Sequence, residues 1–174
     1  GDYTFLNEEL AAHYGVPGVE GERFRLVHYG DIPRRGVLGH GSVLTVTSSP
    51  VRTSPVKRGK WILEELLCSA PPPPPPGVEG LPETEGTTIR ERLEAHSQNP
   101  SCAVCHQAMD PLGFGLEHFD GVGVYRELDG EHPIDATGVL PDGSTFDGAI
   151  ELQAILAADE RVPHCMTEKM FVYG

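Results

Sequence analysis

Three residues within five positions, Cys102, Cys105 and His106, are the side chains most able to do chemistry in this chain. They form a Cys-x-x-Cys-His motif, which is the attachment pattern for c-type haem. In that chemistry the two thiols add to the vinyl groups of the porphyrin, and the imidazole binds one axial position of the iron. We expect Ser101 to open a helix, which places the three side chains at i, i+3 and i+4 on one face. The motif predicts haem c, with thioethers at both cysteines and His106 as the proximal iron ligand.

Two other chemistries use a Cys-x-x-Cys pair, and the surroundings of the motif favour neither. A thioredoxin-like dithiol usually follows a strand in a βαβ pattern, whereas Pro100 and a polar loop lead into this motif. A zinc site needs a second ligand pair at short spacing, whereas the remaining cysteines, Cys68 and Cys165, are single and distant. In an oxidising compartment these two should pair as a disulfide. Two free buried thiols are the alternative.

The second axial position of the iron is not specified by the motif. His96 is the first candidate, because it shares a predicted helix face with Ile89 and Leu93 and lies shortly before Cys102. Its competing interpretation is a histidine that only packs against a helix. The other candidates are an open position and the side chains of His40, Met166 and Met170.

Further side chains near the motif are expected to surround the macrocycle. Met109 follows His106 by three residues, so it should pack beside the ring on the same side rather than bind the iron. Phe114 and Phe119 lie in a glycine-containing stretch and are expected to form a wall. We expect Asp110-Pro111 to end the haem helix, because the residue before a proline is pushed out of the α region.

The composition limits the class of protein and its partners. The chain has 174 residues and a formal net charge of −13, which argues against nucleic acid and suits basic partners. No apolar run reaches membrane-spanning length. The chain starts without methionine and stops at Tyr173-Gly174 within an apolar helical pattern, so we expect it to be a fragment of a longer polypeptide.

A helix is predicted over residues 56–67, before the motif. Ser54 suits its N-cap and Pro55 its first position. The missing side chain of Gly59 should admit a neighbour closely. The basic residues of this helix are expected on a solvated face; they are Lys57, Arg58 and Lys60.

Between this helix and the motif, the six-proline run at 71–76 predicts a polyproline II strut. A polar loop over 77–86 follows. Thr88 and Glu91 have the spacing of a capping box, which begins the helix that carries His96.

After the motif, residues 121–148 predict a small β-structure with hairpin turns at Asp129-Gly130 and Asp142-Gly143. Aspartates recur through this stretch, and turn formation is favoured over calcium binding because their spacing fits no EF-hand. These aspartates are Asp120, Asp129, Asp135, Asp142 and Asp147.

Taken together, several stretches resemble the planctomycete-type cytochrome c proteins, which are multi-domain bacterial proteins built from consecutive domains of unknown function. The resemblance covers nearly the whole chain. The stretches that carry it are 2–8, 52–61, the proline run, the Cys-x-x-Cys-His motif with 109–114, Phe119-Asp120 and 140–143.

The resemblance implies a covalent haem c, export to the periplasm or the cell exterior, and a larger parent chain. Its other domains, or a separate redox protein, would be the partners. The resemblance also implies that residues 1–29 are the tail of a preceding domain, and a histidine at the position of His96 belongs to the family pattern. We assign 30–76 to a helical segment with the polyproline strut, 77–148 to the haem c-binding core with a β-excursion, and 149–174 to truncated C-terminal helices.

The expected fold is mainly α, a cytochrome-c-like helical cluster around one covalent haem with a small β-hairpin excursion and long loops. The first functional hypothesis is electron transfer by a monohaem domain. The second is a peroxidase-like haem oxidoreductase with an open sixth position and an acid–base histidine, His96 or His118. The third is a structural module stapled by its haem. Whether the chain is an enzyme depends on which hypothesis holds.

Overall fold

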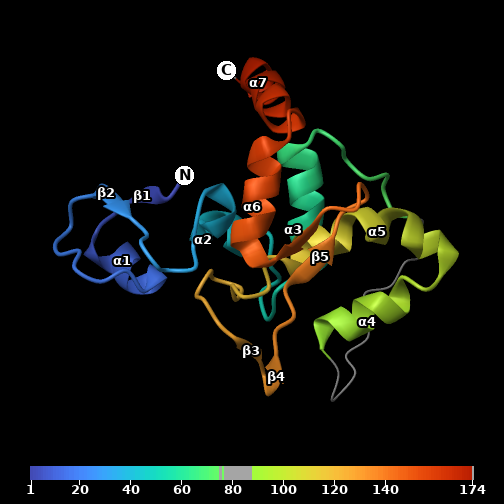
Figure 1. Cartoon of the computed structure of the whole chain (residues 1–174), viewed down its shortest axis with the longest axis horizontal. Coiled ribbons are helices and arrows are strands. Elements are labelled where there is room, and N and C mark those ends of the chain that lie inside the picture. The colour runs from blue at the N-terminus through green and yellow to red at the C-terminus, as the bar shows by residue number, and fades with distance from the viewer. Residues whose placement is uncertain (75, 77–87, 174) are drawn as a thin grey trace.

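The computed structural model describes residues 1–74, 76 and 88–173. The predicted polar loop over 77–86, and with it Pro75 of the proline run, lies outside the described residues. Figure 1 shows a small N-terminal unit at one side of a larger helical body, with helix α7 projecting from the top of that body.

The N-terminal unit consists of one helix and a two-stranded antiparallel sheet. Strand β1 (Tyr3–Leu6) pairs with β2 (Arg25–His28), and α1 (Glu8–Tyr14) lies between them in the chain. The helix begins at Asn7, whose side chain accepts a hydrogen bond from the N–H of Leu10, and it ends at Gly15 in the left-handed conformation. The unit has its own apolar cluster of Leu6, Ala11, Tyr14, Val16 and Tyr29.

Arg34 joins this unit to the larger body. Its guanidinium carbon lies 4.0 Å from the ring centroid of Tyr14 in the small unit and 4.6 Å from that of Phe119 in the larger one. The same guanidinium donates hydrogen bonds to the carbonyl oxygens of Gly39 and Gly123. Arg34 is buried, so cation–π contacts and hydrogen bonds replace its lost water.

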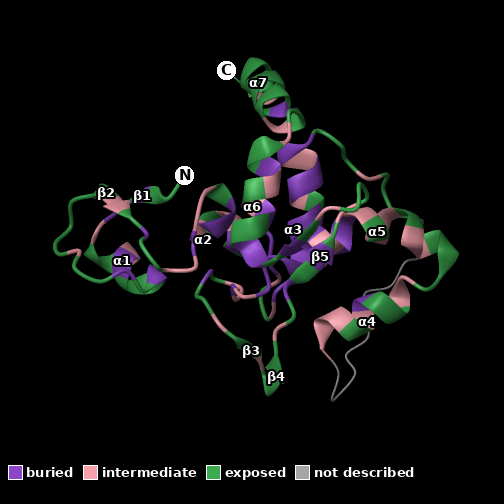
Figure 2. Ribbon diagram, viewed as in Figure 1, coloured by how far each residue is buried: buried purple, intermediate pink, exposed green. Residues whose placement is uncertain are grey.

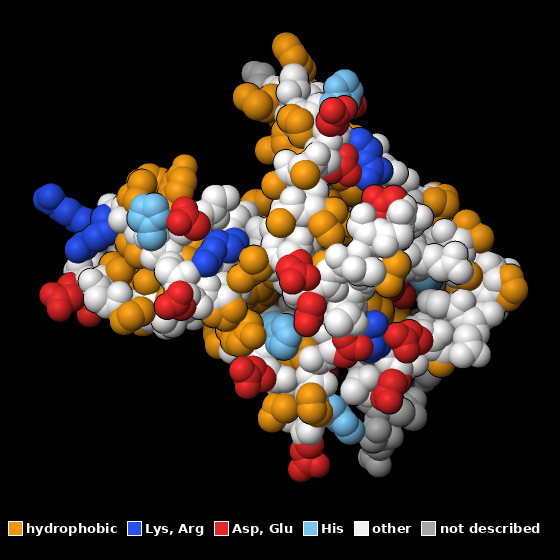
Figure 3. All heavy atoms as spheres, in the orientation of Figure 1, with side chains coloured by type: hydrophobic (Ala, Val, Ile, Leu, Met, Phe, Trp, Pro, Cys, Tyr) orange, Lys and Arg blue, Asp and Glu red, His pale blue; other side chains and the backbone are white. Residues whose placement is uncertain are grey.

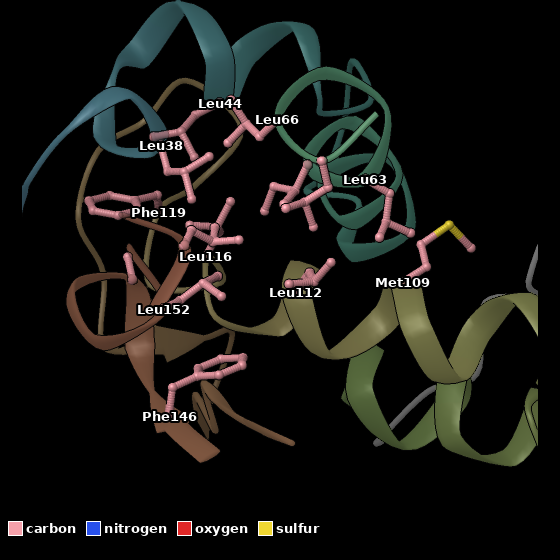
Figure 4. Packing of buried hydrophobic residues seen from close by; sticks show 14 residues of the cluster. Leu38, Leu44, Leu63, Leu66, Met109, Leu112, Leu116, Phe119, Phe146 and Leu152 are labelled. Atoms are coloured by element: carbon pink, nitrogen blue, oxygen red, sulfur yellow. The ribbon is translucent and has the colours of Figure 1, made fainter. Parts of the chain in front are cut away.

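The larger body is built around one apolar core (Figure 4). Its elements are a 3₁₀ turn η1 (Val37–Gly39), α2 (Gly41–Val46), α3 (Pro55–Trp61), a π-helical turn η2 (Ile62–Leu66), α5 (Pro100–Phe114) and α6 (Gly148–Ala158). The core draws side chains from three of the four sequence segments distinguished above, between residues 38 and 156. Figure 4 shows Met109 of α5 beside Leu63, and Leu66 beside Leu38 and Leu44.

Helices α3 and α5 approach closely at two glycines. A Cβ at Gly59 would overlap the carbonyl oxygen of Met109, and a Cβ at Gly113 would overlap that of Pro55. The prediction that Gly59 admits a close neighbour is confirmed. Ser54 caps α3 and Pro55 opens it, as predicted.

Arg58 does not lie on a solvated face, contrary to the sequence prediction. It is fully buried, and its guanidinium pairs with Glu117. The clustering of these basic residues suggested one solvated face, but the 3.6-residue period turns Arg58 toward the core while Lys57 and Lys60 stay outside.

Helix α4 (Ile89–His96) begins with the predicted capping box, in which the Thr88 and Glu91 side chains hydrogen-bond each other's backbone N–H. Two hairpins follow α5. They are β3 (Leu128–Asp129) with β4 (His132–Pro133), and β5 (Thr137–Val139) with β6 (Thr145–Asp147) around the predicted Asp142-Gly143 turn.

Three of the recurring aspartates form turns, as predicted. The carboxylate of Asp120 accepts hydrogen bonds from the N–H groups of Val122 and Val124. Those of Asp135 and Asp142 accept from the N–H two residues onward. These contacts are typical of Asx-turns.

Helix α7 (Arg161–Tyr173) is tied to the body by the predicted disulfide between Cys68 and Cys165. Lys169 adds an ion pair to Glu65 at 2.7 Å. Cys165 is buried, whereas the end of the helix is largely exposed (Figure 2) and presents hydrophobic side chains (Figure 3). None of the described helices is long and apolar enough to span a membrane.

The expected fold class, a mainly α, cytochrome-c-like helical cluster around one covalent haem, is wrong. The helices pack on the apolar core just described, and three two-stranded sheets accompany them in the described part of the chain. Within the motif, Cys105 packs at the edge of this core. Moreover, no three His, Cys, Asp or Glu side chains among the described residues are grouped to hold a metal ion. The apolar pattern predicted side chains that surround a macrocycle, but the buried apolar side chains pack against one another instead.

Candidate functional site

The Cys-x-x-Cys-His motif lies in the first two turns of α5. The helix opens one residue earlier than predicted, at Pro100, because the side chain of Asn99 caps it by accepting the N–H of Ser101. Cys102 and Cys105 are free thiols, and both are half-buried. They stand one turn apart on the helix with His106 directly after them, so the three side chains share one face as predicted.

The helix continues through Pro111 to Phe114, whereas the sequence predicted an end at Asp110-Pro111. Proline removes one N–H and disfavours the α region before it. Here the buried side chains of Leu112 and Phe114 and the close approach at Gly113 hold the last turn against the core. Packing therefore outweighs the local preference, and Asp110 becomes a helical residue one turn after His106.

Asp110 is hydrogen-bonded to His106. Both carboxylate oxygens lie 2.9 Å from the Nδ1 atom of His106. The two side chains are mostly buried, with 16% of the His106 side chain and 6% of the Asp110 side chain exposed. Burial raises the pKa of Asp110, and the contact with His106 opposes that shift.

Helix α4 delivers two further side chains to this pair from its C-terminal end. The ring of His96 meets that of His106 edge to face, with 4.9 Å between centroids. The hydroxyl of Ser97 lies 3.5 Å from Asp110 Oδ2. Together these four residues form the His–Asp cluster, defined here as His96, Ser97, His106 and Asp110.

A small open pocket of about 270 Å³ lies beside the cluster. Its wall includes His106, Asp110 and Phe114 of α5, and Val139 of strand β5. The guanidinium of Arg90 stacks 4.0 Å from the centroid of Phe114 at the same pocket. Arg90 is already paired with the carboxylates of Glu94 and Asp135.

The structure separates the other predicted site residues into several places. Phe114 lies beside His106, but Met109 and Phe119 are buried in the apolar core. Met166 and Met170 line a separate apolar groove of about 970 Å³ along α6 and α7. His40 is half-buried beside Arg34, and burial lowers its pKa. His118 hydrogen-bonds the carbonyl oxygen of Arg126 and stacks on Tyr125.

Sequence reasoning missed Asp110 and Ser97 as members of the site. The signal for Asp110 was present, because positions i and i+4 face each other on a helix. It was hidden by the expectation that the helix ends at this residue. Ser97 carried no comparable signal, since its role depends on how α4 docks against α5.

The fold and the site define a small helical domain with minor β-hairpins that carries Cys-x-x-Cys-His on one long helix. The model of the PSCyt3 family, described as a protein of unknown function (DUF1588), matches residues 34–129, more than half of the chain. The chain therefore belongs to this family, in agreement with the family resemblance of the sequence. No curated protein and no solved structure matches the chain.

Proposed function

We propose that this chain binds haem c through Cys102, Cys105 and His106 and transfers electrons within a larger exported protein. One observation carries the proposal. Two free thiols stand one helical turn apart, and the histidine after them has its Nδ1 engaged by Asp110, which leaves Nε2 as the ligand atom.

The residues present fit this cofactor better than a bare metal ion. The described residues contain no group of three or more metal-binding side chains. Haem c requires less from the protein, because the porphyrin itself supplies four nitrogens and the chain adds two thiols and an axial ligand. Cys102 and Cys105 would hold the macrocycle, His106 would bind the iron, and the bound group would supply one-electron redox chemistry.

His96 is the favoured residue for the other axial position. Of the four side chains considered from the sequence, it is the one whose ring contacts His106. The two rings meet edge to face with 4.9 Å between centroids, so the rings must separate for a macrocycle to lie between them.

The surroundings of the motif suit electron transfer at the protein surface. Val104, between the two cysteines, is 75% exposed, so a partner can approach this side of the helix. The disulfide between Cys68 and Cys165 supports an oxidising, exported location. The proposed partners are other domains of the parent chain or a separate redox protein. The net charge of −13 on this chain favours a partner with a basic surface.

The test is to produce the chain in the bacterial periplasm together with haem-attachment machinery. We expect a mass increase of one haem per chain and low-spin spectra that carbon monoxide does not change. The variant C102A/C105A should lose the added mass, whereas the matched control C68A/C165A should keep it. A wild-type chain without covalent haem would overturn the proposal.

In the haem-loaded protein, carbon monoxide binding distinguishes electron transfer from a peroxidase-like reaction. Spectra unchanged by carbon monoxide in the wild type, together with carbon monoxide binding in H96A, support two histidine ligands and electron transfer. Ready carbon monoxide binding by the wild type would contradict the role of His96 and favour a peroxidase-like reaction.

A further inference from the structure

The contact between His106 and Asp110 has a chemical direction. An ionised carboxylate can only accept hydrogen bonds, and a neutral imidazole carries one proton on one of its two nitrogens. Because both oxygens of Asp110 lie 2.9 Å from Nδ1, the proton belongs on that nitrogen. The lone pair of His106 is then on Nε2.

The carboxylate is itself held in place. Asp110 lies inside α5, one turn after His106 and 6% exposed, so its side chain has little freedom. Ser97 donates to Oδ2 from the C-terminal end of α4 at 3.5 Å. Residues of both α4 and α5 therefore fix the orientation of the Asp110 carboxylate toward the imidazole of His106.

We propose that Asp110 is a positioning residue that locks His106 in its Nδ1–H form and increases electron donation from Nε2. A negative charge on the Nδ1 proton gives the imidazole partial imidazolate character, which raises its basicity as a ligand. A more basic axial ligand stabilises oxidised iron over reduced iron, so Asp110 lowers the reduction potential. The statement about the potential rests on the proposed function, whereas the statement about the proton does not.

The competing interpretation is that Asp110 only ties α4 to α5 through Ser97. In that case removing the carboxylate lowers stability without changing the proton position on His106 or the potential of a bound group. Glu94 offers a matched control, because it lines the same pocket and carries the same charge but is paired with Arg90 rather than with His106.

The first experiment uses the full chain produced without haem-attachment machinery and labelled with ¹⁵N in its histidines. Two-bond proton–nitrogen spectra at mildly alkaline pH identify which ring nitrogen of His106 is protonated. We expect the Nδ1–H form in the wild type and in E94Q, and loss of that preference in D110A. A wild-type His106 in the Nε2–H form, or a folded D110A with an unchanged ring, would overturn the proposal.

The second experiment uses protein loaded with covalent haem and compares D110N, S97A and E94Q with the wild type. At the wild-type midpoint potential, the ratio of reduced to oxidised protein should rise on the order of tenfold in D110N and stay unchanged in E94Q. S97A should give a smaller rise, because it loosens the carboxylate but keeps its charge. An unchanged ratio in D110N contradicts the proposal.

Two further outcomes keep the test decisive. If D110N does not fold, D110E and S97A replace it, and a potential that is unchanged in D110E but raised in S97A supports the role of the charge. If both leave the potential unchanged, the role is refuted. If the wild type takes up no haem, the proposed function fails while the ring spectra still decide the position of the proton.

Discussion

The Nη1 atom of Arg58 lies 3.0 Å from Oε1 of Glu117, and the two side chains are 0% and 5% exposed. The same guanidinium donates to the carbonyl oxygens of Leu116, Phe119 and Asp120. Burial lowers the pKa of Arg58 and raises that of Glu117, because both charges lose water. The pair therefore holds α3 against the segment that follows α5. The hydrogen bonds to the backbone carbonyl groups there replace the water that the buried guanidinium has lost.

Breaking this pair should be costly. We expect Arg58→Met to lower the free energy of unfolding in urea by about 3–5 kcal/mol. Among the described residues, the buried carboxylate of Glu117 would keep only Arg126 as an ionic partner, and the three carbonyl oxygens would lose their donor. Lys60→Met on the same helix removes an ion pair to Glu64 whose side chains are 47% and 30% exposed, and it should cost less than about 1 kcal/mol. The double variant R58M/E117Q should be more stable than Arg58→Met alone. Equal losses at Arg58 and Lys60 would contradict the structural role of the buried pair.

Gly59→Ala should destabilise the protein although alanine is the better helix former. In an exposed helix this change stabilises by about 1 kcal/mol. At Gly59 the new methyl group overlaps the carbonyl oxygen of Met109, so we expect a net loss of more than about 2 kcal/mol in urea unfolding. Gly41→Ala is the control, because its Cβ would have its nearest neighbours at 3.4 Å. A stabilised Gly59→Ala protein would show that α3 and α5 are not in close contact.

Loss of the disulfide should release α7. The bond closes a loop across 97 positions, and Cys165 is the buried residue of this helix. We expect C68A/C165A to lose about 2–5 kcal/mol of stability and to show faster amide hydrogen exchange in residues 161–173 than in α5. A reducing agent should reproduce the effect in the wild type and leave the variant unchanged. Equal protection of α7 in both proteins is the outcome that rejects this prediction.

Stability should fall as the solution is acidified below neutral pH, in part through His40. Burial, and secondarily the charge of Arg34, lowers the pKa of His40 in the folded protein. The unfolded chain, in which a histidine has a pKa of about 6.5, then binds the proton first as the pH falls. Unfolding is favoured in that range, so the free energy of unfolding decreases from about pH 7 to about pH 5.

Comparison with His40→Asn isolates this contribution. The variant should lose less stability than the wild type over the same pH range. Val46→Asn, at an exposed position of the helix α2 that begins directly after His40, should keep the wild-type pH dependence. Parallel curves for the wild type and His40→Asn would remove His40 from the explanation.

Local signals predicted several elements correctly, because their causes lie within a few residues. Ser54 and Pro55 cap α3, Thr88 and Glu91 form the capping box, and Asp142-Gly143 turns the last hairpin. Each depends on side chains that reach neighbouring backbone groups. The close contact at Gly59 was also predicted, because a glycine inside a helix is unfavourable unless its missing side chain admits a neighbour.

The overall arrangement depended on long-range packing that no local pattern contains. Pro111 predicted a helix end, but the contacts of Leu112 and Phe114 with distant segments carry α5 further. The same contacts place Asp110 against His106, so the error about the helix concealed a member of the site. The cysteines and His106 were found because their types and spacing are themselves the signal.

The position of Arg34 determines where this chain can be divided. Its guanidinium touches Tyr14 on one side and Phe119 on the other. A cut between the small unit and the body would remove Tyr14 from one face of the Arg34 guanidinium. It would also expose the ring of Tyr14 to solvent. Cutting the chain after residue 30 should therefore lower the stability of the fragment that keeps Arg34. The two units should be produced as a single chain.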